Sequence, residues 1–283
     1  MDGILIKMTS LIVTADDFGL NRSVNRAVEE AAQSGILTSA SLMLTGRAVD
    51  DAVSIAGGIP SLDVGLHLSL TEGTPVSLPH TVPDLVKENG HFYDSPAMQG
   101  ILLQFKRDVA AQVKKEVSAQ FGAFADTGLP FVHVDSHHHL HVHPKLFDIV
   151  MENAAMYKLH TVRIPYEPWN ISGQICPEHK IRNMFYSMVF SPLCSVCRRK
   201  AELTGLRSSD AVFGLYRTGQ ITERWILKLI DLISGQNGVF ELYTHPCDTS
   251  NSSGMEELKA IVSFEVRKRI YDRGIKLVRY SDL

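Results

Sequence analysis

Three clusters of acidic residues and histidines in this sequence are suited to binding a metal ion and moving a proton. Asp16 and Asp17 are adjacent in TADDFG, directly after an apolar run, and His67 lies in DVGLHLSL. Six of the 12 histidines fall in VHVDSHHHLHVHP, residues 132–144. Two adjacent carboxylates at the end of an apolar run are costly unless a cation neutralises one of them. One carboxylate with two imidazoles would hold a metal and leave positions open for water and substrate.

Each cluster also has an ordinary structural explanation. The two aspartates could be a solvated turn, His67 a hydrogen-bonded core residue, and the histidine cluster a polar turn. Because successive strand residues point in different directions, one aspartate could bind metal while the other faces a reacting water. Six histidines are too many for one ion, so the surplus would orient ligands, contact substrate or support the loop; we expect His139 and His141 to contact substrate.

Two further residues end apolar runs and are candidates for the same site. His245 in ELYTHPCD suits a general acid or a partner for a developing oxyanion, although Pro246 could simply fix it at a strand end. Arg163 in TVRIPYEP could pair with Glu167 or Asp16, and we also expect it to contact substrate.

Short apolar runs alternate with segments of helical periodicity along the chain, which predicts a parallel sheet with helices outside it. Seven or eight strand candidates favour a distorted (β/α) barrel in the α/β class over a short doubly wound sheet. Because barrel enzymes keep their active sites at the carboxyl ends of the strands, the three clusters should meet there. The strand candidates lie at 11–15, 39–45, 62–70, 131–135, 161–165, 238–246 and 276–280, and the helix candidates at 23–35, 48–56, 101–124, from 144 onward, 181–207 and 255–270.

Length and composition indicate one globular domain over residues 1–283, with a loop insertion at about 71–100 and a helical segment at about 178–207. The net charge of −3 gives no basic field for nucleic acid. No apolar run reaches transmembrane length, and the amino terminus lacks a basic n-region, so we expect a cytoplasmic protein. Cys194 and Cys197 form a lone CxxC that reads as two reduced thiols one helical turn apart.

The motifs TADDFGL, ILTSASLM, VGLHLSL, HVDSHHHLH and the late THP together resemble those of the YdjC-like carbohydrate deacetylases, which include chitooligosaccharide deacetylase. They extend over nearly the whole chain. The resemblance implies a distorted (β/α) barrel that is usually a homodimer. It also implies metal ligands, a catalytic base and a late active-site histidine, which fall on Asp17, His67 and His137, on Asp16, and on His245.

The expected reaction is removal of an acetyl group from an N-acetylated amino sugar with one divalent metal ion. The ligand types favour Zn²⁺, while the family is often described with Mg²⁺. A phosphoester hydrolase would also use Asp and His ligands, but usually with two metals and a phosphate-binding group. A metal-binding protein without enzymatic activity is the third possibility, and it would not need Asp16.

Two features bear on the acceptor. The segments VRIPYEPW and AELTGLRSSDAVFGL resemble the branch of the family associated with hopanoid biosynthesis, which implies an N-acetylglucosaminyl lipid as substrate. The stretch at 181–200 is apolar and then basic, and it could pack on the barrel or on a dimer partner. Alternatively, its apolar residues could accept an apolar aglycone or lie against a membrane that carries the lipid; these residues are Met184, Phe185, Met188, Val189 and Phe190.

Overall fold

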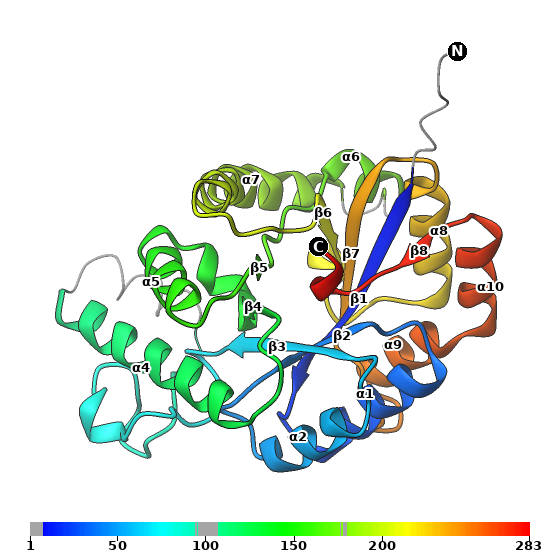
Figure 1. The fold of residues 1–283 in the computed structure, drawn as a ribbon. Helices are drawn as coiled ribbons and strands as arrows, with labels where there is room; N and C mark the ends of the chain where they lie inside the picture. Colours follow the sequence, from blue (N-terminus) through cyan, green and yellow to red (C-terminus); the bar gives the residue numbers. More distant parts are fainter. Residues whose placement is uncertain (1–7, 94, 96–106, 176, 178–179) are drawn as a thin grey trace.

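The computed structural model describes residues 8–93, 95, 107–175, 177 and 180–283. Its centre is one sheet in which every described pair of strands is parallel, in the order β5-β4-β3-β2-β1-β7-β6, with β8 paired to β1 at Ser10 and Leu11. The sheet is curled into an open half-barrel (Figure 1). This confirms the predicted α/β distorted barrel. The strands are β1 (Thr9–Phe18), β2 (Ser39–Leu42), β3 (Asp63–Leu68), β4 (His133–Ser136), β5 (Thr161–Val162), β6 (Ala211–Phe213), β7 (Gly238–Thr244) and β8 (Lys276–Leu277).

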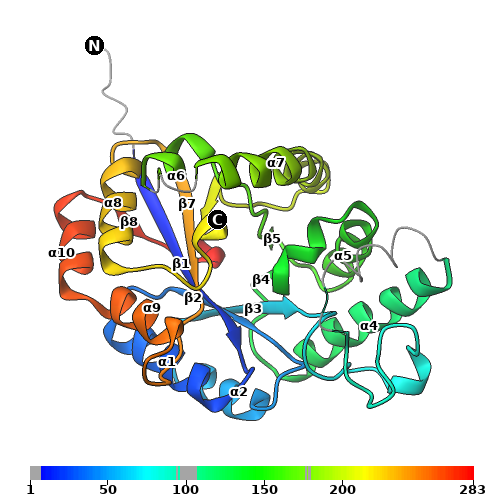
Figure 2. The same cartoon turned by 180° about the vertical axis from the view of Figure 1, so that it is seen from behind.

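Helices pack around the outside of the curled sheet, as the view from behind also shows (Figure 2). Most follow the predicted segments, and the described part of the 101–124 prediction begins at Arg107. Residues 101–106, residues 178–179, Cys176 and part of the 71–100 insertion lie outside the described residues. The helices are α1 (Arg22–Ser34), α2 (Val49–Gly57), α4 (Arg107–Asp126), α5 (Pro144–Met156), α6 (Trp169–Ile175), α7 (Lys180–Leu203), α8 (Glu223–Ile233), α9 (Ser253–Val262) and α10 (Phe264–Asp272).

The prediction of a single long helix at 255–270 is wrong, because the chain forms two helices there, α9 and α10. Ser263 separates the two helices. Its backbone is extended (φ −60°, ψ 132°), and its hydroxyl accepts a hydrogen bond from the backbone N–H of Val266. Serine is a strong N-cap residue, and this local bond competes with helix continuation. β6, α6 and α8 were not predicted. β6 has three residues and α6 has seven, whereas α8 has a clear amphipathic pattern that the sequence analysis missed.

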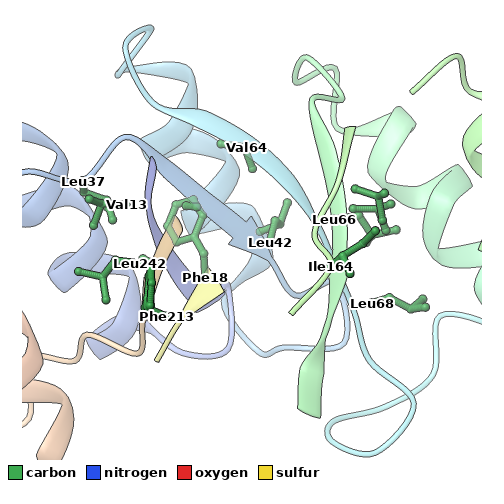
Figure 3. Close-up of a cluster of buried hydrophobic side chains, with 14 of the residues drawn as sticks. Val13, Phe18, Leu37, Leu42, Val64, Leu66, Leu68, Ile164, Phe213 and Leu242 are labelled. Atoms are coloured by element: carbon green, nitrogen blue, oxygen red, sulfur yellow. The ribbon is translucent and has the colours of Figure 1, made fainter. Parts of the chain in front are cut away.

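The two faces of the sheet differ in polarity. Leu11, Val13 and Ala15 of β1 belong to the large apolar core that includes residues of the surrounding helices. Figure 3 shows core side chains from several strands, among them Leu66 of β3 and Leu242 of β7. Since side chains alternate along a strand, the intervening residues face the hollow of the half-barrel. These are largely polar and buried, and they supply the candidate site; they include Thr14, Asp16, Ser41, His67, His133, Asp135 and Glu241.

Within the described part of the chain, no helix combines the length and apolar character needed to cross a membrane.

Candidate active site

The end of β1 presents two carboxylates to the same pocket. Asp17 has a left-handed backbone (φ 62°), and the pairing of β1 with β2 shifts register between Ala15 and Phe18. Gly19 follows with φ 92°, a conformation that glycine adopts at little cost. This turn interrupts the alternation of the strand, so Asp16 and Asp17 both line the pocket. Left-handed backbone at a residue other than glycine is a form of strain that concentrates at functional sites.

Asp17, His67 and His137 bring three potential metal ligands together. Asp17 Oδ1 lies 3.3 Å from His67 Nε2 and 3.0 Å from His137 Nδ1, and one ligand atom from each residue lies within 4.8 Å of the others. The second nitrogen of each imidazole faces another carboxylate: His67 Nδ1 is 2.8 Å from Asp135 and His137 Nε2 is 3.1 Å from Glu72. Such carboxylate partners are typical of metal-binding histidines, because they fix the ring orientation.

The electrostatics of this cluster favour a bound cation. Burial lowers the pKa of His67, but Asp135 and Asp16 outweigh it and raise the value to about 10. Burial likewise lowers the pKa of His137, yet the hydrogen bond with Asp17 raises it to about 9. Burial raises the pKa of Asp17, while His137 and His67 hold it well below its usual range. The carboxylates therefore create a strong local preference for positive charge, which protons or a metal ion can supply.

The donor set fits a divalent metal ion. His67 Nε2 is buried and lacks a well-formed hydrogen bond, although it faces Asp17. A second group, Asp16, His67 and Asp135, is also close enough to share an ion. In that group one oxygen of each aspartate is bound by Arg163, and His67 Nδ1 is bound by Asp135. The group containing Asp17 is thus the better candidate, and the nature of the metal is left open by the ligands.

Arg163 is fully buried below the pocket rather than in its lining. Its guanidinium contacts three buried carboxylates, at 2.8 Å from Asp16 and 2.7 Å from Glu241, and also Asp135. Burial lowers the pKa of Arg163, but these carboxylates raise it well above its ordinary value. Glu241 also accepts a hydrogen bond from the hydroxyl of Tyr280. The predicted pairing of Arg163 with Asp16 is observed, and Arg163 is not among the residues that line the pocket.

His141, which we expected to contact substrate, is fully buried and is not among the residues that line the pocket. Its Nδ1 lies 2.6 Å from the Ser136 hydroxyl and its Nε2 lies 2.8 Å from the backbone oxygen of Arg163. Burial lowers its pKa to about 4, so it is neutral at pH 7. His141 supports the turn that carries His137 and His139.

His139 and His245 do line the pocket. His139 adopts a left-handed backbone (φ 55°), and its Nε2 lies 3.1 Å from the hydroxyl of Tyr243. The Nδ1 atoms of His139 and His245 are buried, with no hydrogen-bond partner in the described residues. Both side chains thus lie at the pocket, and each has one nitrogen without a partner among the described residues.

The pocket has a volume of about 540 Å³. The side that carries Asp17, His67 and His137 is polar, while α7 and the segment after β6 supply an aromatic and aliphatic side. It is lined by Asp16, Asp17, His67, His137, His138, His139, Tyr186, Phe190, Leu215, Thr218, Tyr243 and His245.

Sequence reasoning missed Glu72, Glu241 and Tyr243 as contributors to the site. The sequence indicated Glu241 and Tyr243, because they alternate with His245 at every second position of the strand predicted at 238–246 and so share its face. Nothing in the sequence indicated Glu72, since it lies in the loop after β3 with no regular spacing.

Comparison with known proteins agrees with this geometry. Residues 10–272 match the family described as YdjC-like protein. The chain belongs to the YdjC-like family. It is 30% identical over 282 residues to a carbohydrate deacetylase of Brevibacillus brevis, covering 96% of this chain and 99% of the relative. A carbohydrate deacetylase of Geobacillus stearothermophilus is 31% identical over 280 residues, with 96% of each chain covered.

Two further relatives extend the comparison. A chitooligosaccharide deacetylase of an Enterobacter species is 28% identical over 285 residues, covering 96% of this chain and 98% of the relative. The solved structure of a protein from Enterococcus faecalis V583 is 26% identical and superposes with a TM-score of 0.72, covering 97% of this chain and 98% of the other. These similarities involve nearly the full length of each chain, so they extend across all elements that form the pocket.

Proposed function

We propose that this chain is a metal-dependent hydrolase that removes the acetyl group of an N-acetylated amino sugar and releases acetate. The carbohydrate deacetylase activity, hydrolysis of an amide bond, rests on relatives that match it over almost its whole length. The metal dependence rests on one observation, the buried group of Asp17, His67 and His137 in the pocket.

A divalent ion held by Asp17, His67 and His137 would lower the pKa of a water molecule and polarise the acetyl carbonyl. Two imidazoles and one carboxylate favour Zn²⁺ by ligand type, whereas Mg²⁺ prefers oxygen ligands and keeps several waters. Both ions therefore belong in the reconstitution experiments.

Asp16 is placed to act as the general base. Arg163 holds its Oδ2 at 2.8 Å, whereas Oδ1 has no partner among the described residues. One oxygen is thus fixed in position, and the other is available to take a proton from the attacking water. Arg163 acts here as a positioning residue, because it touches Asp16 and not the pocket.

His245 is the proposed proton donor to the leaving amine. It lines the pocket with its Nδ1 unpartnered, and its backbone N–H is fixed by Glu257 at 2.6 Å. His139 and Tyr243 would contact the sugar, since they lie on the same side of the pocket and are hydrogen-bonded to each other.

The apolar side of the pocket supports a finer proposal, that the acceptor carries an apolar aglycone such as a hopanoid. Tyr186 and Phe190 of α7 line the pocket. Phe185, Met188 and Val189 continue along the same helix and are 61–62% exposed. This surface would contact the lipid or the membrane around it. A homodimer that covers α7 is the alternative use of the same surface.

The phosphoester hydrolase is the less favoured function. The two metal-binding groups found in the described residues share His67, so they do not form the two independent ion sites that such enzymes usually use. In Asp16, Arg163 holds one carboxylate oxygen while the other has no partner among the described residues. A metal-binding protein without activity would not require this arrangement.

One assay separates these functions. Purified protein, with and without chelator, is incubated with N-acetylated oligosaccharides and with phosphate monoesters, and acetate and phosphate are measured. Chelator-sensitive acetate release supports the proposal, phosphate release supports the phosphoesterase, and neither product supports metal binding alone. A higher kcat/KM for an N-acetylglucosaminyl lipid than for N-acetylated chitobiose is expected for the apolar acceptor. Equal or better activity on chitobiose would contradict that finer proposal and leave the deacetylase intact.

A further inference from the structure

Three glutamates of this protein are buried against backbone N–H groups rather than against cations. Glu116 and Glu257 are fully buried and Glu167 is 3% exposed. None of the three forms an ion pair within the part of the chain that the structure describes. Burying a carboxylate without a cation is costly, and the cost is reduced only when several hydrogen-bond donors surround it.

Glu167 binds the beginning of the segment that follows β6. Its Oε2 accepts hydrogen bonds from the backbone N–H groups of Gly214 and Tyr216, each at 3.2 Å, and the N–H of Leu215 also contributes. Its Oε1 accepts a hydrogen bond from the hydroxyl of Ser172. Burial raises the pKa of Glu167 to about 7 despite these donors.

Glu257 of α9 binds the end of the same segment. Its Oε1 accepts a hydrogen bond from the N–H of Ile221 at 3.3 Å, and the N–H of Gly219 contributes as well. Its Oε2 accepts a hydrogen bond from the N–H of His245 at 2.6 Å. One buried carboxylate therefore joins the segment to the backbone of the proposed proton donor.

Residues 214–221, held at both ends by these glutamates, form one wall of the pocket. Leu215 and Thr218 line the pocket directly. The hydroxyl of Thr218 lies 3.0 Å from that of Tyr243, which in turn contacts His139. The wall is thus in direct contact with Tyr243, one of the proposed sugar-contacting residues.

The wall begins at Gly214, a position that requires glycine. Gly214 has φ 126°, which residues with a side chain rarely adopt, and a Cβ there would lie 2.8 Å from the backbone oxygen of Tyr243. Glutamine cannot replace Glu257, because both carboxylate oxygens accept from backbone N–H groups and the amide would turn an NH₂ donor toward one of them. At Glu167 one oxygen faces the Ser172 hydroxyl, which can also accept, so methionine is the substitution that removes the acceptors there. A carboxylate, by contrast, accepts at both oxygens.

We propose that Glu167 and Glu257 are positioning residues that fix the 214–221 wall for substrate binding, and that Glu257 also fixes His245. Where it predicts effects on KM and kcat, this inference rests on the proposed function. Glu116 is the matched control, since it accepts hydrogen bonds from the backbone N–H groups of Val76 and Ser77, each at 2.9 Å, in a loop outside the pocket lining.

The experiment compares Glu167→Met, Glu257→Gln and Glu116→Gln in the metal-loaded full chain. Measurements are amide hydrogen exchange of residues 214–221, metal content, Tm, and the KM and kcat of acetate release. We expect faster exchange in the first two variants, with unchanged metal content. Their KM should rise roughly ten-fold, the effect of losing hydrogen bonds to a charged group. Glu257→Gln should also lower kcat, because His245 loses its anchor.

The control decides between positioning and ordinary stability. Glu116→Gln should lower Tm while leaving the exchange of 214–221 unchanged. If Glu167→Met and Glu257→Gln lower Tm and also leave KM and the exchange of 214–221 unchanged, the glutamates only stabilise the fold and the inference is wrong. If the unaltered protein releases no acetate, the proposed function fails, and the exchange data still test whether the two glutamates hold the wall.

Discussion

Replacing Arg163 with Met tests whether the guanidinium below the pocket holds the site together. The side chain is fully buried and its charge is shared by Asp16, Asp135 and Glu241. Met has a similar length and apolar stem, so the substitution removes the charge and its hydrogen bonds with little change in packing. Three carboxylates would then be left buried without their common cation.

The expected destabilisation is large. Breaking a buried ion pair by removing one partner costs about 3 to 5 kcal/mol. Three carboxylates depend on Arg163, so the upper part of this range is expected. For a chain of this size, about 2 °C of Tm is lost per kcal/mol, which gives a fall of roughly 6 to 10 °C. Added divalent metal should restore part of this loss, because it supplies positive charge next to the same carboxylates.

Thermal unfolding of the Arg163→Met variant, with chelator and with metal, measures this effect. Arg269→Met is the control, because Arg269 pairs with Asp231 at the surface, where both side chains are 36% exposed. An exposed pair contributes about 0 to 1 kcal/mol, so its removal should shift Tm by no more than about 2 °C. Equal shifts in the two variants would refute the argument that Arg163 neutralises the buried carboxylates.

Further predictions concern individual residues. Asp16→Asn should retain a full equivalent of metal by elemental analysis, while its kcat should fall by about two to four orders of magnitude. Loss of the metal would show that Asp16 is a ligand rather than a free base. Glu72→Gln should weaken metal binding about ten-fold in chelator competition, because His137 loses the carboxylate that orients it. An unchanged metal affinity would show that Glu72 does not orient His137. In the native protein, iodoacetamide should modify Cys247 before Cys194. Burial raises the pKa of the Cys194 thiol to about 12, whereas at Cys247 hydrogen bonds with Ser23 and Thr249 outweigh the effect of burial and lower the pKa. Peptide mass spectrometry would detect the order, and the reverse order would contradict the assigned burial.

The barrel could be predicted because its strands are buried on both faces and its helices are amphipathic. Apolar runs such as LIVTA locate β1 well, and parallel strands necessarily place their carboxyl ends together. For this reason Asp17, His67 and His137 meet in the structure although they are far apart in the sequence. A pattern of residue types sufficed for this step, since it depends on topology rather than on side-chain detail.

Features that depend on local backbone or on loops could not be predicted in the same way. The left-handed conformation of Asp17 interrupts strand alternation, and no residue type in DDFG requires it. Glu72 approaches His137 from a loop without regular spacing. Arg163 shows a further limit: the sequence places it at a strand end, but only the packing of the curled sheet reveals that three carboxylates enclose it.

The central claim is that one metal ion, held by Asp17, His67 and His137, is required for deacetylation. Its most direct test is acetate release by metal-stripped protein as Zn²⁺ or Mg²⁺ is added back. The predicted rate is near zero without metal and reaches a plateau at one bound equivalent per chain, with His67→Ala binding little metal and staying inactive. Full activity in the stripped protein, or an active His67→Ala variant that retains its metal, would contradict the account.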